Sequence, residues 1–302
     1  MHSTLGELAA LATSLCWTVS ATFFTLASQR VGSMIVNRAR LVVAALFLIT
    51  THWLILGQPI PFGAEAERWL WLGLSGIIGL AVGDAFLFQA YIWIGPRLTM
   101  LLMSTAPVIS GLLAWATLGE KLRGLQWLGV LLTVAGITWV VLERGNGSDK
   151  DDPARRNDLR GILFGLGAAL AQAIGLILAK RGLGGDFPAL SGNVIRMLTA
   201  AAALWGLTLL QGQARATVQR LTKERSALLP IVGGSFMGPF LGVWLSLASI
   251  QLSQIGVAST LMALPPVFLL PVARFYFHEH IGWRAVAGTL VALAGVVLLF
   301  LV

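Results

Sequence analysis

The amino-acid sequence predicts an all-α polytopic membrane protein in which ten transmembrane helices form two inverted five-helix repeats. Hydrophobic residues make up 57% of the chain and charged residues only 11%. A soluble domain carries about 25% charged residues, so this chain could not cover a water-facing surface. Apolar runs of about 20 residues recur, and each is long enough to cross a bilayer core as a helix.

The third observation behind this fold class is an internal repeat. Five residues of the first half recur 159 residues later: Gly79, Pro107, Glu120, Gly129 and Gly136 correspond to Gly238, Pro266, Glu279, Gly288 and Gly295. Nearer the start of each half the spacing is 156, and Asn37 and Arg40 correspond to Asn193 and Arg196. Because each half holds five spans, an odd number, the two halves are expected to sit in the membrane with opposite orientations.

The predicted elements follow in order along the chain. The spans of the first half are expected at residues 5–28, 33–56, 69–93, 98–118 and 124–143, and those of the second at 160–180, 188–211, 228–250, 254–277 and 283–302. The longest polar run, from Glu143 to Arg160, separates the two halves. The predicted organisation is therefore a first repeat at 1–143, a polar linker at 144–159 and a second repeat at 160–302.

Charge and cysteine usage exclude several other classes of protein. The net charge of +8 does not indicate a nucleic-acid partner, because the basic residues sit at span ends and in loops, where anionic headgroups attract them. Cys16 is the one cysteine, so it has no disulfide partner and no metal-ligand spacing. The N-terminal residues lack a basic segment and are interpreted as a first span rather than a cleaved signal peptide.

Two short acidic turns precede the Gly-rich last span of each half: Gly119-Glu120-Lys121-Leu122 and His278-Glu279-His280-Ile281. With ten spans in two halves, they give the whole chain a resemblance to the drug/metabolite transporter superfamily, and to its EamA family in particular. The resemblance implies a central cavity lined by the first, third, fourth, sixth, eighth and ninth spans. It also implies transport of small organic metabolites, often outward. The second turn departs from the first, with His278 in place of Gly119.

Asp84 is the only carboxylate deep inside any predicted span. A charge at the bilayer centre costs on the order of 3 kcal/mol or more, so Asp84 should face the bundle interior or water. Phe88 and Tyr91 follow four and seven residues later and share its helix face. Asp84 is expected either to bind a proton or a substrate amino group, or to pair with an arginine and fix packing. The corresponding residue of the second half is Val243.

Arg40 and Arg196 lie a few residues into the second and seventh predicted spans. Long basic side chains near span ends commonly extend to the headgroups, and this interpretation is favoured for both. The alternative is a pairing with Asp84 or with a carboxylate of the substrate.

Trp17 lies mid-span, whereas most tryptophans of membrane proteins gather near the interfaces. Ser14 and Thr18 lie beside it on the helix, and Trp244 is also deep in its span. Gln172 is a polar group inside an apolar helix. Such side chains suit an amphipathic ligand and join Asp84, Phe88 and Tyr91 in the predicted substrate site. The alternatives are plain packing for the tryptophans and a helix–helix hydrogen bond for Gln172.

Prolines at matching positions of the fourth and ninth spans, Pro107 and the pair Pro265-Pro266, are expected to kink these helices and to act as hinges. A static kink is the alternative. His278-Glu279-His280 is not expected to bind metal, because residues two apart do not share a helix face and no third ligand is evident.

The leading functional hypothesis is a secondary transporter that moves an amino acid or similar amphipathic solute outward by alternating access. The chain has no Walker motif, so it does not encode ATP hydrolysis, and no cofactor is expected. If transport is active, Asp84 is the proton acceptor for coupling; uniport needs no such residue. Alternatives are a multidrug or organic-cation exporter of the same fold, a non-transporting scaffold, and an intramembrane enzyme, which the lack of clustered catalytic residues disfavours.

The expected partners are a small-molecule substrate, the lipid bilayer and, in the coupled case, protons. The protein is expected to be a multi-pass component of a bacterial or archaeal plasma membrane, as a monomer or homodimer. The positive-inside rule favours outward termini, whereas the family resemblance implies cytoplasmic ones.

Overall fold

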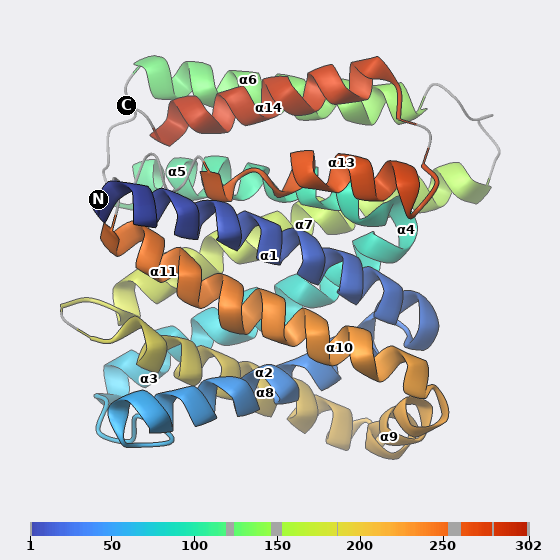
Figure 1. The fold of residues 1–302 in the computed structure, drawn as a ribbon. Helices are drawn as coiled ribbons and strands as arrows, with labels where there is room; N and C mark the ends of the chain where they lie inside the picture. The colour runs from blue at the N-terminus through green and yellow to red at the C-terminus, as the bar shows by residue number, and fades with distance from the viewer. Residues whose placement is uncertain are drawn as a thin grey trace.

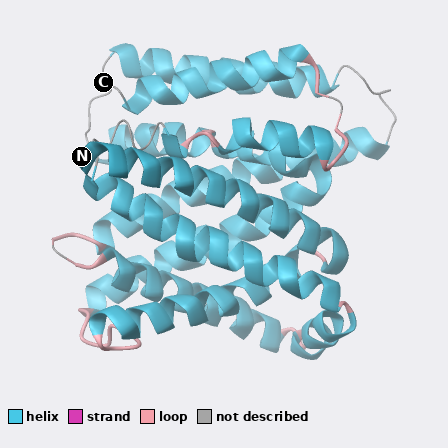
Figure 2. Cartoon of the chain, viewed as in Figure 1, coloured by secondary structure: helices cyan, strands magenta, loops and turns pink. Residues whose placement is uncertain are grey.

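The computed structural model describes residues 2–118, 124–145, 153–185, 187–252, 261–279 and 281–300. These residues contain helices and loops but no β-strand, and the helices lie side by side in one bundle (Figure 2). The elements of the first half are α1 (His2–Val31), α2 (Ser33–Leu56), α3 (Ala66–Ser75), η1 (Gly76–Gly83), α4 (Asp84–Met103), α5 (Thr105–Leu118) and α6 (Gly124–Gly145). Those of the second are α7 (Pro153–Gly182), α8 (Ala189–Leu210), α9 (Ala214–Lys223), η2 (Arg225–Ala227), α10 (Leu228–Ser235), η3 (Phe236–Gly242), α11 (Val243–Leu252), α13 (Pro265–Phe275) and α14 (Trp283–Phe300).

Seven stretches of the described chain are long and apolar enough to cross a membrane. They are Thr4–Val31, Ser33–Leu56, Ala66–Met103, Gly124–Leu142, Asp158–Gly182, Ala189–Leu210 and Arg225–Ser246. The 38-residue stretch Ala66–Met103 contains the predicted third span and the start of the fourth. It is interrupted at Gly95, whose φ of 78° is not helical. The helical fold is therefore confirmed, whereas the number of ten spans stays a prediction.

Two local features differ from the sequence-based expectations. The loop after the seventh predicted span contains the short helix α9. α7 begins at Pro153, inside the predicted linker, and linker residues 146–152 lie outside the described residues.

The prolines expected to kink the fourth and ninth spans each follow an interruption of the helix and lie at the start of the next one. Pro265 and Pro266 occupy the first positions of α13, and Pro107 lies in the first turn of α5. This placement follows from proline chemistry, since the missing N–H costs nothing in the first turn of a helix. The interruptions lie at matching places, at Ser104 and at Leu264, and the role of the prolines as hinges stays a prediction.

Both halves contain a π-helical segment at the same position of their third predicted span. These segments, η1 and η3, have the sequences GIIGLAVG and FMGPFLG. The π-helix is a rare widening of the helical turn that frequently marks functional sites. Its glycines permit close contact with another helix.

The first helix of each half packs into the third span of the other half. α1 contacts α10, η3 and α11, while α7 contacts α3, η1 and α4 (Figure 1). A Cβ atom added to Gly238 would lie 2.3 Å from Ser20 Oγ, and one added to Gly175 would lie 3.2 Å from Gly79 Cα. Glycine is therefore what lets these helices approach so closely, and the two halves interlock.

α6 and α14 correspond to each other in the repeat and form one edge of the bundle (Figure 1). A Cβ atom on Gly136 would lie 2.4 Å from Ala292 N, and one on Gly295 would lie 2.4 Å from Thr133 N. Along α6 the residue number rises from Thr133 to Gly136, while along α14 the facing residue number falls from Gly295 to Ala292. The two helices are therefore antiparallel. Gly136 corresponds to Gly295 in the repeat, and Thr133 corresponds to Ala292, so the two contacts are equivalent.

Candidate functional site

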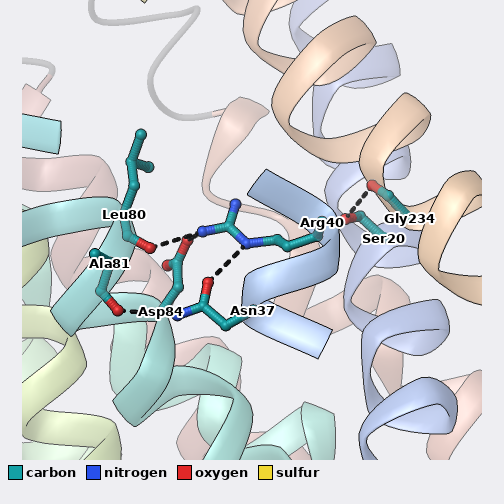
Figure 3. Close-up of polar contacts among 7 residues, drawn as sticks. All are labelled: Ser20, Asn37, Arg40, Leu80, Ala81, Asp84 and Gly234. Atoms are coloured by element: carbon teal, nitrogen blue, oxygen red, sulfur yellow. Dashed lines mark hydrogen bonds and ion pairs between the residues drawn. The ribbon is translucent and has the colours of Figure 1, made fainter. Parts of the chain in front are cut away.

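Asp84 forms a buried ion pair with Arg40, whose Nη2 donates to Asp84 Oδ2 (Figure 3). Arg40 comes from α2, and Asp84 is the first residue of α4, directly after the π-helical segment η1. The Arg40 side chain is only 3% exposed. The favoured interpretation of Arg40, extension to the headgroups, is therefore wrong, because the cost of burying both charges is lower when they compensate each other.

Backbone carbonyls of η1 complete the partners of this ion pair. Arg40 Nη2 donates to Leu80 O at 2.8 Å, and Asn37 Nδ2 donates to Ala81 O at 2.9 Å. Asn37 Oδ1 in turn accepts a hydrogen bond from Arg40 Nε at 3.2 Å. Where a helix changes its hydrogen-bond pattern, carbonyls become available to side chains. The network thus joins α2 to the widened turn of the third span.

Aromatic rings enclose the ion pair on the side of α4. Arg40 Cζ lies 5.3 Å from the centre of the Phe88 ring, within the range of a cation–π contact. Phe88 also contacts Tyr91 at 5.8 Å and Phe24 of α1 at 4.9 Å between ring centres. The structure therefore brings Asp84, Phe88 and Tyr91 together, all of them buried.

Arg196 and Gln172 approach the same segment η1 from α8 and α7. Both lie next to Gly79: a Cβ atom there would be 3.2 Å from Gln172 Oε1 and 3.8 Å from Arg196 Nη2. Among the described residues, Gln172 Oε1 and Arg196 Nε are buried and have no hydrogen-bond partner. The predicted helix–helix hydrogen bond of Gln172 is thus not made by its amide oxygen.

The remaining predicted substrate residues are spread over other places. Ser14 and Thr18 donate to carbonyls of their own helix, at Leu11 and at Ser14, both at 2.8 Å. Trp17 packs on η3, where a Cβ atom on Gly242 would lie 2.8 Å from its Nε1. Bonding within the helix leaves these hydroxyls less available to a ligand.

Trp244 is 45% exposed and lines a small pocket of about 20 Å³. The other residues of this pocket are Leu48, Leu190, Asn193, Phe240 and Val243. Val243 and Asn193 correspond to Asp84 and Asn37 of the first repeat, so the second repeat holds a small apolar pocket where the first holds the ion pair.

A second ion pair, absent from the sequence-based expectations, joins Arg97 Nε to Glu279 Oε2 at 3.2 Å. Glu279 reaches the break at Gly95, where a Cβ atom would lie 2.6 Å from its Oε1. This contact and the positive φ both require glycine at position 95. His280 lies outside the described residues, so the predicted lack of a metal site at His278-Glu279-His280 stays untested.

The sequence predicts Asp84 as a site residue, but for its partner Arg40 it favours extension to the headgroups over the ion pair. One signal was present: Asn37 and Arg40 are three residues apart and therefore share a helix face. The η1 carbonyls gave no such signal, because a π-helical turn depends on packing as well as on the sequence.

The chain matches the model of the EamA-like transporter family twice, over residues 4–142 and 159–301. It is 24% identical over 212 residues to "Uncharacterized transporter YwfM" of Bacillus subtilis (strain 168), which covers 68% of this chain and 67% of the relative. A solved structure described only as "Crystal structure of protein" has a TM-score of 0.67 at 17% identity, covering 99% of this chain and 97% of the other. At this identity the likeness concerns the fold alone.

Proposed function

Since the chain belongs to the EamA-like transporter family, we propose that it is a secondary transporter that moves a small organic solute across the membrane by alternating access. The observation that carries this proposal is that the first helix of each repeat packs on the other repeat, around a cluster of polar side chains on η1. In carriers of this type, the substrate site lies near the midplane, between repeats of opposite orientation.

The antiparallel packing of α6 against α14 supports an inverted relation between the repeats. Corresponding helices related by a two-fold axis in the membrane plane must run in opposite directions, and the contacts of Gly136 and Gly295 follow this rule. We therefore keep the division into repeats at 1–143 and 160–302, with ten spans in total. The paired helix starts at Pro107 and Pro265-Pro266 are the proposed hinges, because each follows an interruption of the chain.

The polar cluster on η1 is the proposed centre of the transport site. It contains the ion pair of Asp84 with Arg40 and, on the opposite repeat, Arg196 and Gln172. Coupling to protons through Asp84 requires that the pair with Arg40 opens during the cycle, because protonation removes the negative charge that holds the guanidinium. The aromatic side chains of Phe88 and Tyr91 favour an amphipathic solute.

We propose export of an amino acid or a similar solute across the plasma membrane of a bacterium or archaeon, by a monomer or homodimer. The alternative, an exporter of organic cations, is less well supported. A cation would need a free carboxylate, and Asp84 already has a guanidinium partner.

The test is flux of a labelled amino-acid panel into proteoliposomes, for wild type and Asp84→Asn, with and without a pH gradient. We expect saturable flux in wild type and loss of the pH-driven part in Asp84→Asn. Trp53→Phe, at an exposed position of α2, is the control for an altered side chain outside the cluster. Gradient-driven flux that survives Asp84→Asn would remove Asp84 from coupling, and no flux of any solute would contradict the transporter proposal itself.

A further inference from the structure

Arg196 sits where two helices approach each other unusually closely. Its backbone lies against η1, because a Cβ atom on Gly76 would be 2.1 Å from Arg196 O. Its guanidinium reaches along the same segment towards Gly79. Gly76 and Gly79 of η1 therefore leave room for Arg196 between the two repeats.

The charges around η1 do not balance. Asp84 is the only acidic side chain of the cluster, and it is bound to Arg40. Arg196 lies within electrostatic range of the same carboxylate, yet its buried Nε finds no acceptor within the part of the chain that the structure describes. Two guanidinium groups thus share one carboxylate, and one positive charge stays uncompensated in a largely apolar environment. Such a charge normally acquires a partner.

A hydrogen-bond acceptor lies beside this charge. Gln172 Oε1 is buried, and within the described ranges no donor reaches it. It approaches the same position above Gly79 as Arg196 Nη2 does. An unpaired donor group and an unpaired acceptor therefore flank one point of the interface, and a ligand that carries both complementary groups would satisfy them together.

We propose that Arg196 binds the carboxylate of the transported solute and that Gln172 Oε1 accepts a hydrogen bond from a hydroxyl or ammonium group beside that carboxylate. The proposal rests on the transport function proposed above and assigns its ligand chemistry: a small monocarboxylic acid with a neighbouring donor. A guanidinium suits this role because it holds a carboxylate through two parallel hydrogen bonds. Arg40 is not equivalent, since its Nε and Nη2 already donate to Asn37, Leu80 and Asp84.

Ligand protection of the purified protein against heat tests this binding without requiring flux. The probes are matched pairs: lactate with lactamide, phenylalanine with phenylalaninamide, and lactate with propionate, which lacks the donor. We expect the acids to raise the melting temperature of wild type and the amides to leave it unchanged. Propionate should protect at least tenfold less effectively than lactate.

The decisive variant is Arg196→Gln, with Arg215→Gln as the control for removal of an exposed charge on α9. The concentration of acid that gives half-maximal protection should rise at least tenfold in Arg196→Gln and stay unchanged in Arg215→Gln. Arg196→Lys, which keeps the charge but not the paired donors, should lie between them and serves as the test if Arg196→Gln does not fold. Gln172→Leu should abolish the advantage of lactate over propionate.

Three results would overturn the proposal: undiminished protection of Arg196→Gln, equal protection of wild type by amides, or no protection by any acid. Flux measurements on the same panel separate this failure from failure of the transporter proposal. Saturable flux of amines or uncharged solutes without acid binding would refute the role of Arg196 and leave transport intact.

Discussion

The two repeats place an arginine at the same position of α2 and α8 but give it different surroundings. Arg40 donates to Asp84, Leu80 and Asn37, whereas the buried Nε of Arg196 has no hydrogen-bond partner within the described chain. Two features separate them: Val243 of the second repeat stands in place of Asp84, and Arg196 packs against η1 of the other repeat, whereas Arg40 donates to η1 of its own. The scaffold is thus duplicated, but its interior is asymmetric.

Two other contacts between the halves, by contrast, are symmetric. Gly136 and Gly295 make equivalent contacts, and so do Ser20 and Ser75. This contrast teaches that the symmetric parts hold the bundle together, while the asymmetric part is available for function. Paired substitutions test it: equal effects are expected where the symmetry holds and unequal effects where it is broken.

The largest expected difference is between Arg40→Ala and Arg196→Ala. Breaking a buried ion pair typically costs about 3 to 5 kcal/mol, because the remaining charge loses its partner. Arg40→Ala should therefore lower the free energy of unfolding by about 3 kcal/mol, whereas Arg196→Ala should lower it much less, because it breaks no ion pair. Thermal unfolding in detergent can be followed with a thiol-reactive dye, because Cys16 is the only cysteine and is buried.

The double variant Arg40→Ala/Asp84→Ala provides the control for this comparison. It removes both charges and should recover part of the loss seen in Arg40→Ala. If Arg40→Ala and Arg196→Ala were equally destabilising, the two arginines would be equally well partnered, and the asymmetry between the repeats would disappear.

An intermediate and symmetric effect is expected for Gly136→Ala and Gly295→Ala. In each variant the new methyl group would lie 2.4 Å from a backbone nitrogen of the facing helix, so α6 and α14 must move apart. Overpacking of this kind costs about 1 to 3 kcal/mol. Melting curves of both variants should shift equally downward, whereas Gly206→Ala, with no atom within 4 Å of the added group, should not shift. A large shift in only one of the pair would refute the symmetry of this interface.

The smallest effect is expected for two hydrogen bonds that join the halves. Ser20 Oγ donates to Gly234 O at 2.9 Å, and Ser75 Oγ donates to Gly175 O at 2.6 Å. Gly234 and Ser75 are equivalent positions in the third spans of the two repeats. The third span therefore accepts the first hydrogen bond, which is drawn in Figure 3, and donates the second. Ser20→Ala and Ser75→Ala should each cost about 0.6 kcal/mol, a typical value for interhelical hydrogen bonds in membranes. The same melting assay checks this, with Ser226→Ala on the exposed surface as the reference; a several-fold difference between the pair would contradict it.

Most of the secondary structure could be predicted from the sequence, because apolar length is a local property. The predicted span 33–56 coincides with α2, and 124–143 lies within α6. The helix α9 escaped prediction, because its ten residues are polar on average and its apolar positions are few. The prolines were placed correctly along the chain, but whether they bend a helix or begin one depended on where the neighbouring helix stopped.

By itself the sequence determined that the chain is helical and membrane-spanning, that it consists of two repeats, and that Asp84 lies inside. These conclusions rest on the cost of exposing apolar surface or of burying charge, which is set by residue type and spacing. Tertiary structure alone decided which arginine pairs with Asp84 and which carbonyls support the pair. Arg40 and Arg196 have similar local sequences, and the packing of α7 and α8 on η1, with the hydrogen bonds from α2 to η1, distinguishes the partnered guanidinium of Arg40 from that of Arg196.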